Sequence, residues 1–180
     1  HDALPISQLQ FQNQEVFFDP SEIIVSKTDL KGNMTYVNQT FCNVSGYKEI
    51  DLLGKPHSLI RHSNMPRSVF KLVWDRVQSG REVFGYVVNK TINGDYYWVF
   101  AHVTPSFDEN HKIIGYHSNR RVPDANTITS VISPLYAKLL QIEESHPSRK
   151  EGMFAAYKFL LDVLAEKGIE YDEFIFSLQG

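Results

Sequence analysis

Residues 82–104 read EVFGYVVNKTINGDYYWVFAHVT, and this stretch decides the fold. Segments 82–91 and 95–104 are rich in β-branched and aromatic residues, which are typical of strands. They flank Asn-Gly at 93–94, the strongest short signal for a β-hairpin. A third segment of the same kind, 112–121, follows a polar turn. We therefore predict three consecutive antiparallel strands.

The preceding part of the chain supplies two more strands and several helices. Residues 22–28 and 34–38 are predicted to form a hairpin. Short helices are expected at 39–45 and 48–53, and a longer helix runs from Pro66 to about residue 79, with its apolar residues mostly on one side. This order predicts an α+β domain, in which short helices cover one face of a five-stranded antiparallel sheet.

Composition excludes several classes of protein. The chain has 180 residues, 42% of them hydrophobic and 13% aromatic, which is enough for a buried core. Its net charge of −3 argues against a nucleic-acid or anionic-membrane binder. No apolar run approaches the roughly 18 residues that a membrane span needs. The single cysteine, Cys42, cannot form an internal disulfide, so we expect a cytoplasmic protein.

We divide the chain into an N-terminal segment at 1–21, the sheet domain at 22–123 and a helical extension at 124–180. Apolar residues at 153–164 form a stripe in the extension, which most simply packs into a core. Alternatively, the stripe relays a signal or docks a partner.

Both faces of the strand at 95–104 are apolar. The first face carries Tyr97, Val99, Ala101 and Val103, and the second carries Tyr96, Trp98, Phe100 and His102. The second face therefore needs a cover, because an exposed apolar strip at Trp98 and Phe100 would promote association or aggregation. We expect a homodimer through this outer face or the terminal helices, or else a cover from within the chain.

Two polar features interrupt these apolar elements. The loop GKPHSLIRHSNMP at 54–66 carries Arg61 and His62, which from spacing alone would cap neighbouring helices and carbonyls. Asn89 ends the apolar row Val83, Gly85 and Val87 on one strand face. A buried amide needs a partner, which is either backbone or the polar edge of a bound ring system.

Three short motifs lie in the first part of the predicted sheet domain: Thr28-Asp29-Leu30-Lys31-Gly32, Tyr36-Val37-Asn38 and Ser45-Gly46-Tyr47. These motifs resemble those of PAS sensor domains. More specifically, residues 22 to about 140 resemble the flavin-binding PAS domain of bacterial aerotaxis receptors. That resemblance is carried by Gly54-Lys55-Pro56-His57, Ile60-Arg61-His62, Met65-Pro66, Asn89, Asn93-Gly94-Asp95 and Tyr97-Trp98-Val99.

The resemblance implies a non-catalytic sensor of redox state or oxygen. Its sheet would hold FAD non-covalently against the short helices, and the flavin redox state would be relayed to a signalling partner or a fused output domain. The expected cofactor-binding residues are Arg61, His62, Asn64, Phe70, Trp74, Phe84, Asn89, Val99 and Ala101. Two of these depart from the family pattern, which has an acidic residue at Asn64 and tryptophan at Phe84.

Other readings stay open. A haem-binding gas sensor would need His57, His62 or His117 as axial ligand, and a cofactor-free PAS domain would serve only for dimerisation or interaction. A flavoenzyme lacks support, because the sequence has no Gly-rich dinucleotide motif. Blue-light adduct chemistry needs a cysteine where Arg61-His62-Ser63 stands. The histidines do not have metal-site spacing, so no metal ligands are predicted.

Overall fold

The computed structural model describes residues 8–179 and divides them into two compact units. The sheet unit comprises 13–62 and 73–123. The helical unit comprises 8–12, 63–72 and 124–179. Residues 1–7 of the predicted N-terminal segment and Gly180 of the predicted extension lie outside the described residues.

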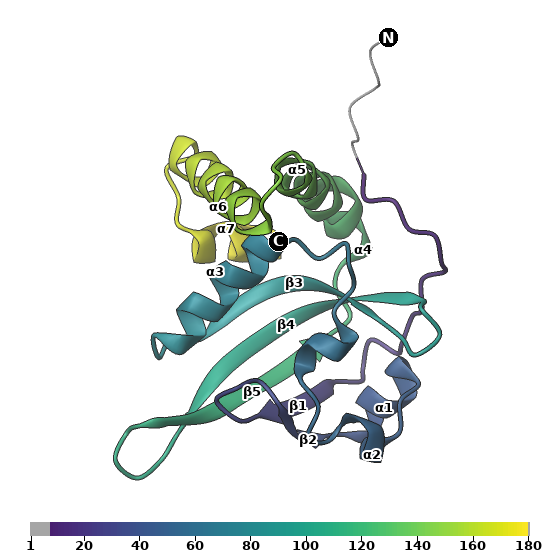
Figure 1. The fold of residues 1–180 in the computed structure, drawn as a ribbon. Coiled ribbons are helices and arrows are strands. Elements are labelled where there is room, and N and C mark those ends of the chain that lie inside the picture. The colour runs from purple at the N-terminus through teal and green to yellow at the C-terminus, as the bar shows by residue number, and fades with distance from the viewer. Residues whose placement is uncertain (1–7, 180) are drawn as a thin grey trace. The chain divides into compact units, whose positions relative to one another are not determined.

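The sheet unit contains the five predicted strands. They are β1 (Ile24–Thr28), β2 (Met34–Val37), β3 (Val83–Lys90), β4 (Tyr96–Phe107) and β5 (Ile113–Arg121). Their order is β2-β1-β5-β4-β3, and every neighbouring pair is antiparallel (Figure 1). The predicted α+β architecture with a five-stranded antiparallel sheet is therefore confirmed.

Strand register assigns each side chain to one face of the sheet. Asn89 lies opposite Tyr97 on the neighbouring strand, and Ala101 lies opposite Arg120. Because side chains alternate along a strand, these residues share one face, which we call the inner face. The inner face carries Ile24, Ser26, Val87, Asn89, Tyr97, Val99, Ala101, Tyr116 and Arg120. The outer face carries Phe84, Tyr86, Trp98, Phe100 and His102.

Short helices cover part of the inner face. They are α1 (Gln39–Ser45), α2 (Glu49–Leu52) and the 3₁₀ turn η1 (His57–Ile60). Figure 1 shows α1 and α2 beside β1 and β2. One buried core unites these helices with the sheet, through Phe41, Val44, Leu52, Ile60, Ile24, Met34, Val37, Tyr97 and Val99.

Asn38 joins the first hairpin to α1. Its Oδ1 accepts hydrogen bonds from the backbone nitrogens of Phe41 at 3.1 Å and Val25 at 3.0 Å, and its Nδ2 donates to the Ile23 carbonyl at 2.8 Å. The first bond is a helix N-cap. This explains why asparagine suits the end of the Tyr-Val-Asn motif.

Replacing Asn38 by alanine is therefore expected to lower the free energy of unfolding by about 1–2 kcal/mol. Urea denaturation measures this loss. The matched control is Gln39→Ala on the same turn, whose side chain bonds only to Asn43 at an exposed position. Equal stability of the two variants would show that the cap contributes nothing.

The outer face is partly closed without a second chain. Trp98 and Tyr86 are buried, and Phe84 stacks on His102 with ring centroids 4.1 Å apart. Burial of the Trp98 strip therefore does not require a homodimer. Dimerisation through this face or the terminal helices stays a prediction.

The helical unit contains the remaining helices and the first half of α3 (Arg67–Gln78), which continues into the sheet unit. The other elements are α4 (Ala125–Thr127), η2 (Ile128–Ile132), α5 (Ser133–Glu144), α6 (Arg149–Glu166) and α7 (Tyr171–Ser177). No helix within residues 8–179 has the length and apolar character needed to cross a membrane.

The buried side of α6 differs from the stripe expected at 153–164. Its buried residues are Gly152, Ala156, Leu160 and Leu164, whereas Phe154 and Leu161 are exposed. Backbone proximity explains the difference. A Cβ at Gly152 would stand 2.2 Å from the Glu143 carbonyl oxygen of α5, so only glycine fits there. Leu160 and Leu164 of the expected stripe are buried, but the close approach to α5 adds the small residues Gly152 and Ala156 in place of Phe154 and Leu161.

Candidate functional site

Arg120 of β5 is a buried cation on the inner face, with 1% of its surface exposed. Its Nη2 donates to Ser26 Oγ at 2.6 Å, and its Nη1 donates to His57 Nε2 at 3.2 Å. The Cζ atom lies 4.7 Å from the centroid of the Phe41 ring. Burial lowers the pKa of the guanidinium to about 10, so it stays protonated at neutral pH. Within residues 8–179, no carboxylate pairs with this charge and its Nε has no hydrogen-bond partner.

His57 is neutral beside this cation. Burial, followed by the positive charges of Arg120 and Arg61, lowers its pKa to about 3. The unprotonated Nε2 therefore accepts from Arg120, and the Ser26 hydroxyl lies 3.2 Å from the same nitrogen. Protonation of His57 would add a third positive charge to those of Arg120 and Arg61. His57 therefore does not balance the charge of Arg120.

Two further polar groups on the inner face are buried. Asn89 is 3% exposed and Tyr97 is 0% exposed. Neither Asn89 Nδ2 nor the Tyr97 hydroxyl has a hydrogen-bond partner in the described part of the chain. Burial raises the pKa of Tyr97 to about 12, although the nearby Arg120 charge and the Asn89 amide act in the opposite direction. The amide therefore stands near the hydroxyl without completing a hydrogen bond.

These three unpaired atoms distinguish the inner face from an ordinary core. Buried polar groups in proteins nearly always have partners, because an unmade hydrogen bond costs about 1–3 kcal/mol. Asn89 Nδ2 and Arg120 Nε are donors, and the Tyr97 hydroxyl can donate or accept. Together they would suit a ligand with several hydrogen-bond acceptors along one edge.

The polar loop from the sequence lies along the sheet edge at β3. Arg61 forms an isolated antiparallel bridge with Asn89, and the His62 nitrogen donates to the Val88 carbonyl at 3.3 Å. Burial lowers the pKa of Arg61, and burial followed by the Lys90 charge lowers that of His62. The loop therefore brings Arg61 next to Asn89, as a shared site requires.

Three of the predicted apolar residues also belong to this side of the sheet. Val99 and Ala101 are buried on the inner face. Trp74 of α3 packs against Tyr116 of β5, with ring centroids 4.9 Å apart. The structure thus groups Trp74, Val99 and Ala101 with the side of the sheet that carries Asn89 and Arg120.

Phe84 does not lie on the inner face with Val99 and Ala101. It lies one position from Gly85, whose face it cannot share, and it stacks on Phe100 and His102 of the outer face. Side-chain alternation separates it from Asn89, which is an odd number of residues away. The prediction of Phe84 as a wall of the cofactor site is therefore corrected.

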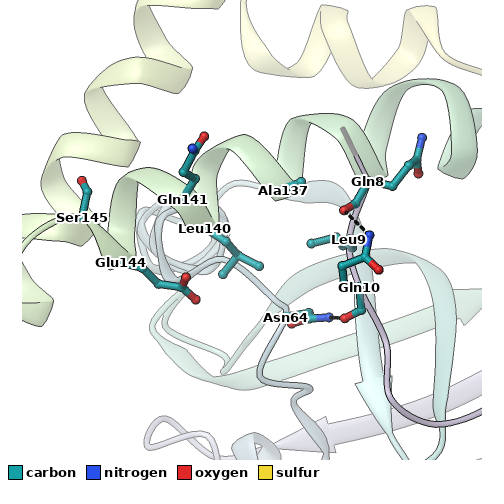
Figure 2. Close-up of a pocket in the computed structure, with 9 residues that line it drawn as sticks. All are labelled: Gln8, Leu9, Gln10, Asn64, Ala137, Leu140, Gln141, Glu144 and Ser145. Carbon is teal, nitrogen blue, oxygen red and sulfur yellow. Dashed lines mark hydrogen bonds between the residues drawn. The ribbon is translucent and has the colours of Figure 1, made fainter. Parts of the chain in front are cut away.

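Asn64 and Phe70 fall in the helical unit. Phe70 keeps 37% of its surface exposed. Asn64 Nδ2 donates to the Gln10 carbonyl at 2.7 Å, beside a pocket of about 330 Å³ along α5 (Figure 2). In that pocket Gln8 and Gln10 donate to backbone carbonyls. None of its lining residues carries one of the unpaired buried atoms, so the inner face is the stronger candidate site.

Sequence reasoning missed Arg120 and Ser26. The sequence of β5 did contain a signal. Tyr116, Ser118 and Arg120 lie on one face of this strand, and Gly115 and His117 lie on the other. Without the strand register, however, nothing showed that this face was the inner one.

Comparisons with known proteins identify the class. Residues 34–120 match the sequence model of the family described as the PAS fold. The light-state structure of the blue-light photoreceptor Aureochrome1 LOV matches with a TM-score of 0.53 at 20% identity, over 68% of this chain and 91% of that chain. The PAS domain of a Colwellia psychrerythraea protein matches with a TM-score of 0.52 at 19% identity, over 56% and 86%. Residues 34–120 therefore have the PAS fold, as the motifs indicated.

Two relatives narrow this class. The aerotaxis receptor of Escherichia coli (strain K12) is 40% identical over 116 residues, which are 64% of this chain and 22% of the receptor. The nitrogen fixation regulatory protein of Klebsiella pneumoniae is 26% identical over 113 residues, which are 61% of this chain and 23% of that protein. The PAS domain therefore resembles that of an aerotaxis receptor, while the chain spans less than a quarter of either relative.

Proposed function

We propose that the sheet unit is a PAS domain that senses redox state or oxygen through non-covalently bound FAD. The observation that carries this proposal is the set of unpaired buried atoms on the inner face: Asn89 Nδ2, Tyr97 Oη and Arg120 Nε. A flavin ring is flat and largely apolar, with carbonyl oxygens and ring nitrogens along one edge. The apolar Trp74, Val99 and Ala101 beside these polar atoms fit such a group.

Each residue of the site has a defined task in this proposal. When bound, the flavin supplies reversible electron transfer. Asn89 would hold the polar edge, since its amide can donate through Nδ2 or accept through Oδ1. Arg61 would supply a second cation at the sheet edge. The backbone of Asn89 is bridged to that of Arg61. A rotation of the Asn89 side-chain amide would therefore act on the loop at 54–62 through this bridge.

Signalling completes the proposal. The relatives are named as a receptor and a regulatory protein, which supports a sensory role over a catalytic one. We propose that the domain acts in the cytoplasm and passes its redox state to a signalling partner or a fused output domain. The outer face and the terminal helices are the proposed surfaces for that partner or for a second copy.

Haem is the less favoured cofactor. His57 Nε2 already accepts from Arg120, and two cations near it would oppose a bound iron ion. His117 belongs to the other face of β5, where its Nε2 lies 3.1 Å from Asn119 Oδ1. Of the histidines considered from the sequence, neither His57 nor His117 offers a free axial ligand on the inner face.

The test is the absorption spectrum of the purified protein, followed by acid release and chromatography of any chromophore. A two-banded yellow spectrum and released FAD are expected. A single intense Soret band would replace FAD by haem, and a protein that stays colourless after refolding with FAD would overturn the proposal.

Asn89→Ala is expected to weaken FAD binding at least tenfold, which corresponds to about 1.4 kcal/mol. Fluorescence titration of the apoprotein measures the dissociation constant. Asn119→Ala is the matched control, because it removes the same amide from the outer face of β5. If both variants bind FAD equally well, Asn89 has no role in holding the cofactor.

A further inference from the structure

We propose that Arg120 sets the redox potential of the bound flavin by stabilising the negative charge that reduction adds. This inference rests on the proposed FAD binding, but it concerns a residue that no sequence motif identified. It also assigns a task that differs from holding the oxidised ring. The starting point is a buried guanidinium without an anion to balance it.

The surroundings of Arg120 lack negative charge on every side. β1 contributes the Ser26 hydroxyl, η1 contributes neutral His57, α1 contributes the Phe41 ring, and β4 contributes the Tyr97 phenol. The cross-strand neighbours Ile24 and Ala101 are apolar. Arg61, the other charge that acts on His57, has the same sign. The described residues therefore leave this cation uncompensated.

An uncompensated buried charge is costly for folding. Moving a cation out of water carries a penalty of several kcal/mol, and partners of opposite charge normally offset it. Here neutral groups solvate two of the three guanidinium nitrogens, while Nε is left without a partner. Such an arrangement suits a ligand whose electron density rises when it is reduced.

The redox step balances simply. Two electrons and one proton, delivered by a chemical reductant such as dithionite, convert a neutral oxidised flavin into a singly negative reduced flavin. A fixed cation near the ring lowers the energy of that anion relative to the oxidised form. Arg120 therefore raises the midpoint potential and favours uptake of one proton rather than two.

Variants at the adjacent residues Arg120 and Arg121 test whether the Arg120 charge raises the midpoint potential of the flavin. Arg120→Gln removes the charge but keeps a donor, Arg120→Lys keeps the charge, and Arg121→Gln removes the exposed charge next to it. Spectroelectrochemical titration measures the midpoint potential of the flavin-loaded proteins. Arg120→Gln is expected to weaken binding of reduced flavin at least tenfold relative to oxidised flavin, a fall of about 30 mV or more. Arg120→Lys and Arg121→Gln should stay near the wild-type value.

The pH dependence of the wild-type potential gives an independent reading, even if Arg120→Gln no longer retains flavin. From about pH 6 to 8 we expect a slope of about 30 mV per pH unit, which corresponds to one proton per two electrons. His57 with a pKa of about 3 and Tyr97 with a pKa of about 12 do not titrate in this interval. His57 and Tyr97, the two titratable groups beside Arg120, therefore do not contribute to the slope.

The outcomes separate the two proposals. A wild-type protein that binds no flavin ends the proposed function, and this inference with it. Flavin bound at an unchanged potential in Arg120→Gln would overturn the inference alone. A wild-type slope near 59 mV per pH unit, two protons per two electrons, would do the same.

Discussion

Replacing Glu143 by alanine is expected to lower the free energy of unfolding of the helical unit by about 3–5 kcal/mol. Glu143 lies near the end of α5 and is 3% exposed. Its Oε1 accepts from the Arg67 nitrogen at 3.0 Å, and its Oε2 accepts from the Ser68 nitrogen at 3.1 Å and from Ser68 Oγ at 2.8 Å. One carboxylate thus caps the first turn of α3 from a distant helix.

Two opposing effects decide the size of this loss. Alanine removes the cost of burying a carboxylate, but it leaves two backbone donors and the hydroxyl of fully buried Ser68 without their acceptor. It also removes a negative charge from the positive end of the helix dipole. Three hydrogen bonds to a charged acceptor outweigh the recovered desolvation energy, so we expect a net destabilisation.

Urea denaturation and amide hydrogen exchange measure the effect. Glu143→Ala should shift the unfolding midpoint and remove protection from the Arg67 and Ser68 amides. Glu144→Ala is the matched control, since that exposed neighbour should change stability by less than about 0.5 kcal/mol. Ser68→Ala, which loses only the hydroxyl, should cost about 1 kcal/mol. Unchanged exchange at both amides would show that the Glu143 carboxylate does not protect the first turn of α3.

The α5–α6 packing explains how the carboxylate is positioned. Gly152 allows the backbone of α6 to approach Glu143 so closely that any Cβ would collide with it. The capped helix, α3, then continues past Leu72 into the sheet unit, where its Trp74 packs on Tyr116. Within the helical unit, this contact therefore fixes the first turn of α3.

Local signals were sufficient for most of the sheet. Asn-Gly at 93–94 predicted the β3–β4 hairpin, and the loop between these strands, at 91–95, holds Gly94 at a φ of 86°, a conformation that favours glycine. Gly46 ended α1 in the left-handed conformation, with φ of 79°. These features depend on residues within a few positions of one another, so the sequence alone reveals them.

The site was harder to predict because it is assembled from distant segments. Arg120 faces inward only because β5 pairs with β1 and β4 in one register, and nothing within β5 specifies that register. Asn64 lies in the same loop as Arg61, at 54–66, yet it groups with the helical unit. Phe84 is different, since period-two alternation already placed it opposite to Asn89.

Acid is expected to destabilise the sheet unit through His57 by about 3 kcal/mol between pH 7 and about pH 3.5. The folded protein holds the pKa of His57 at about 3, against 6.5 for an ordinary histidine. Between these values the unfolded chain binds a proton that the folded chain does not, so stability falls as the pH falls below about 6.5. Complete exclusion of the proton would contribute about 1.4 kcal/mol per pH unit. We expect less, because His57 as a residue is only partly buried.

His57→Gln isolates this contribution, because glutamine can still accept from Arg120 but does not titrate. At pH 7 the variant should be less stable than the wild type, since the fit around Arg120 and Ser26 is lost. As the pH falls to 4, that difference should narrow by about 2–3 kcal/mol, while the shared carboxylates titrate equally in both proteins and cancel. His111→Asn, a change at an exposed turn with φ of 60°, is the control for replacing a histidine away from Arg120. A pH-independent difference for His57→Gln would mean that the folded protein accepts a proton at His57, and that the Arg120 charge does not lower the pKa of that ring.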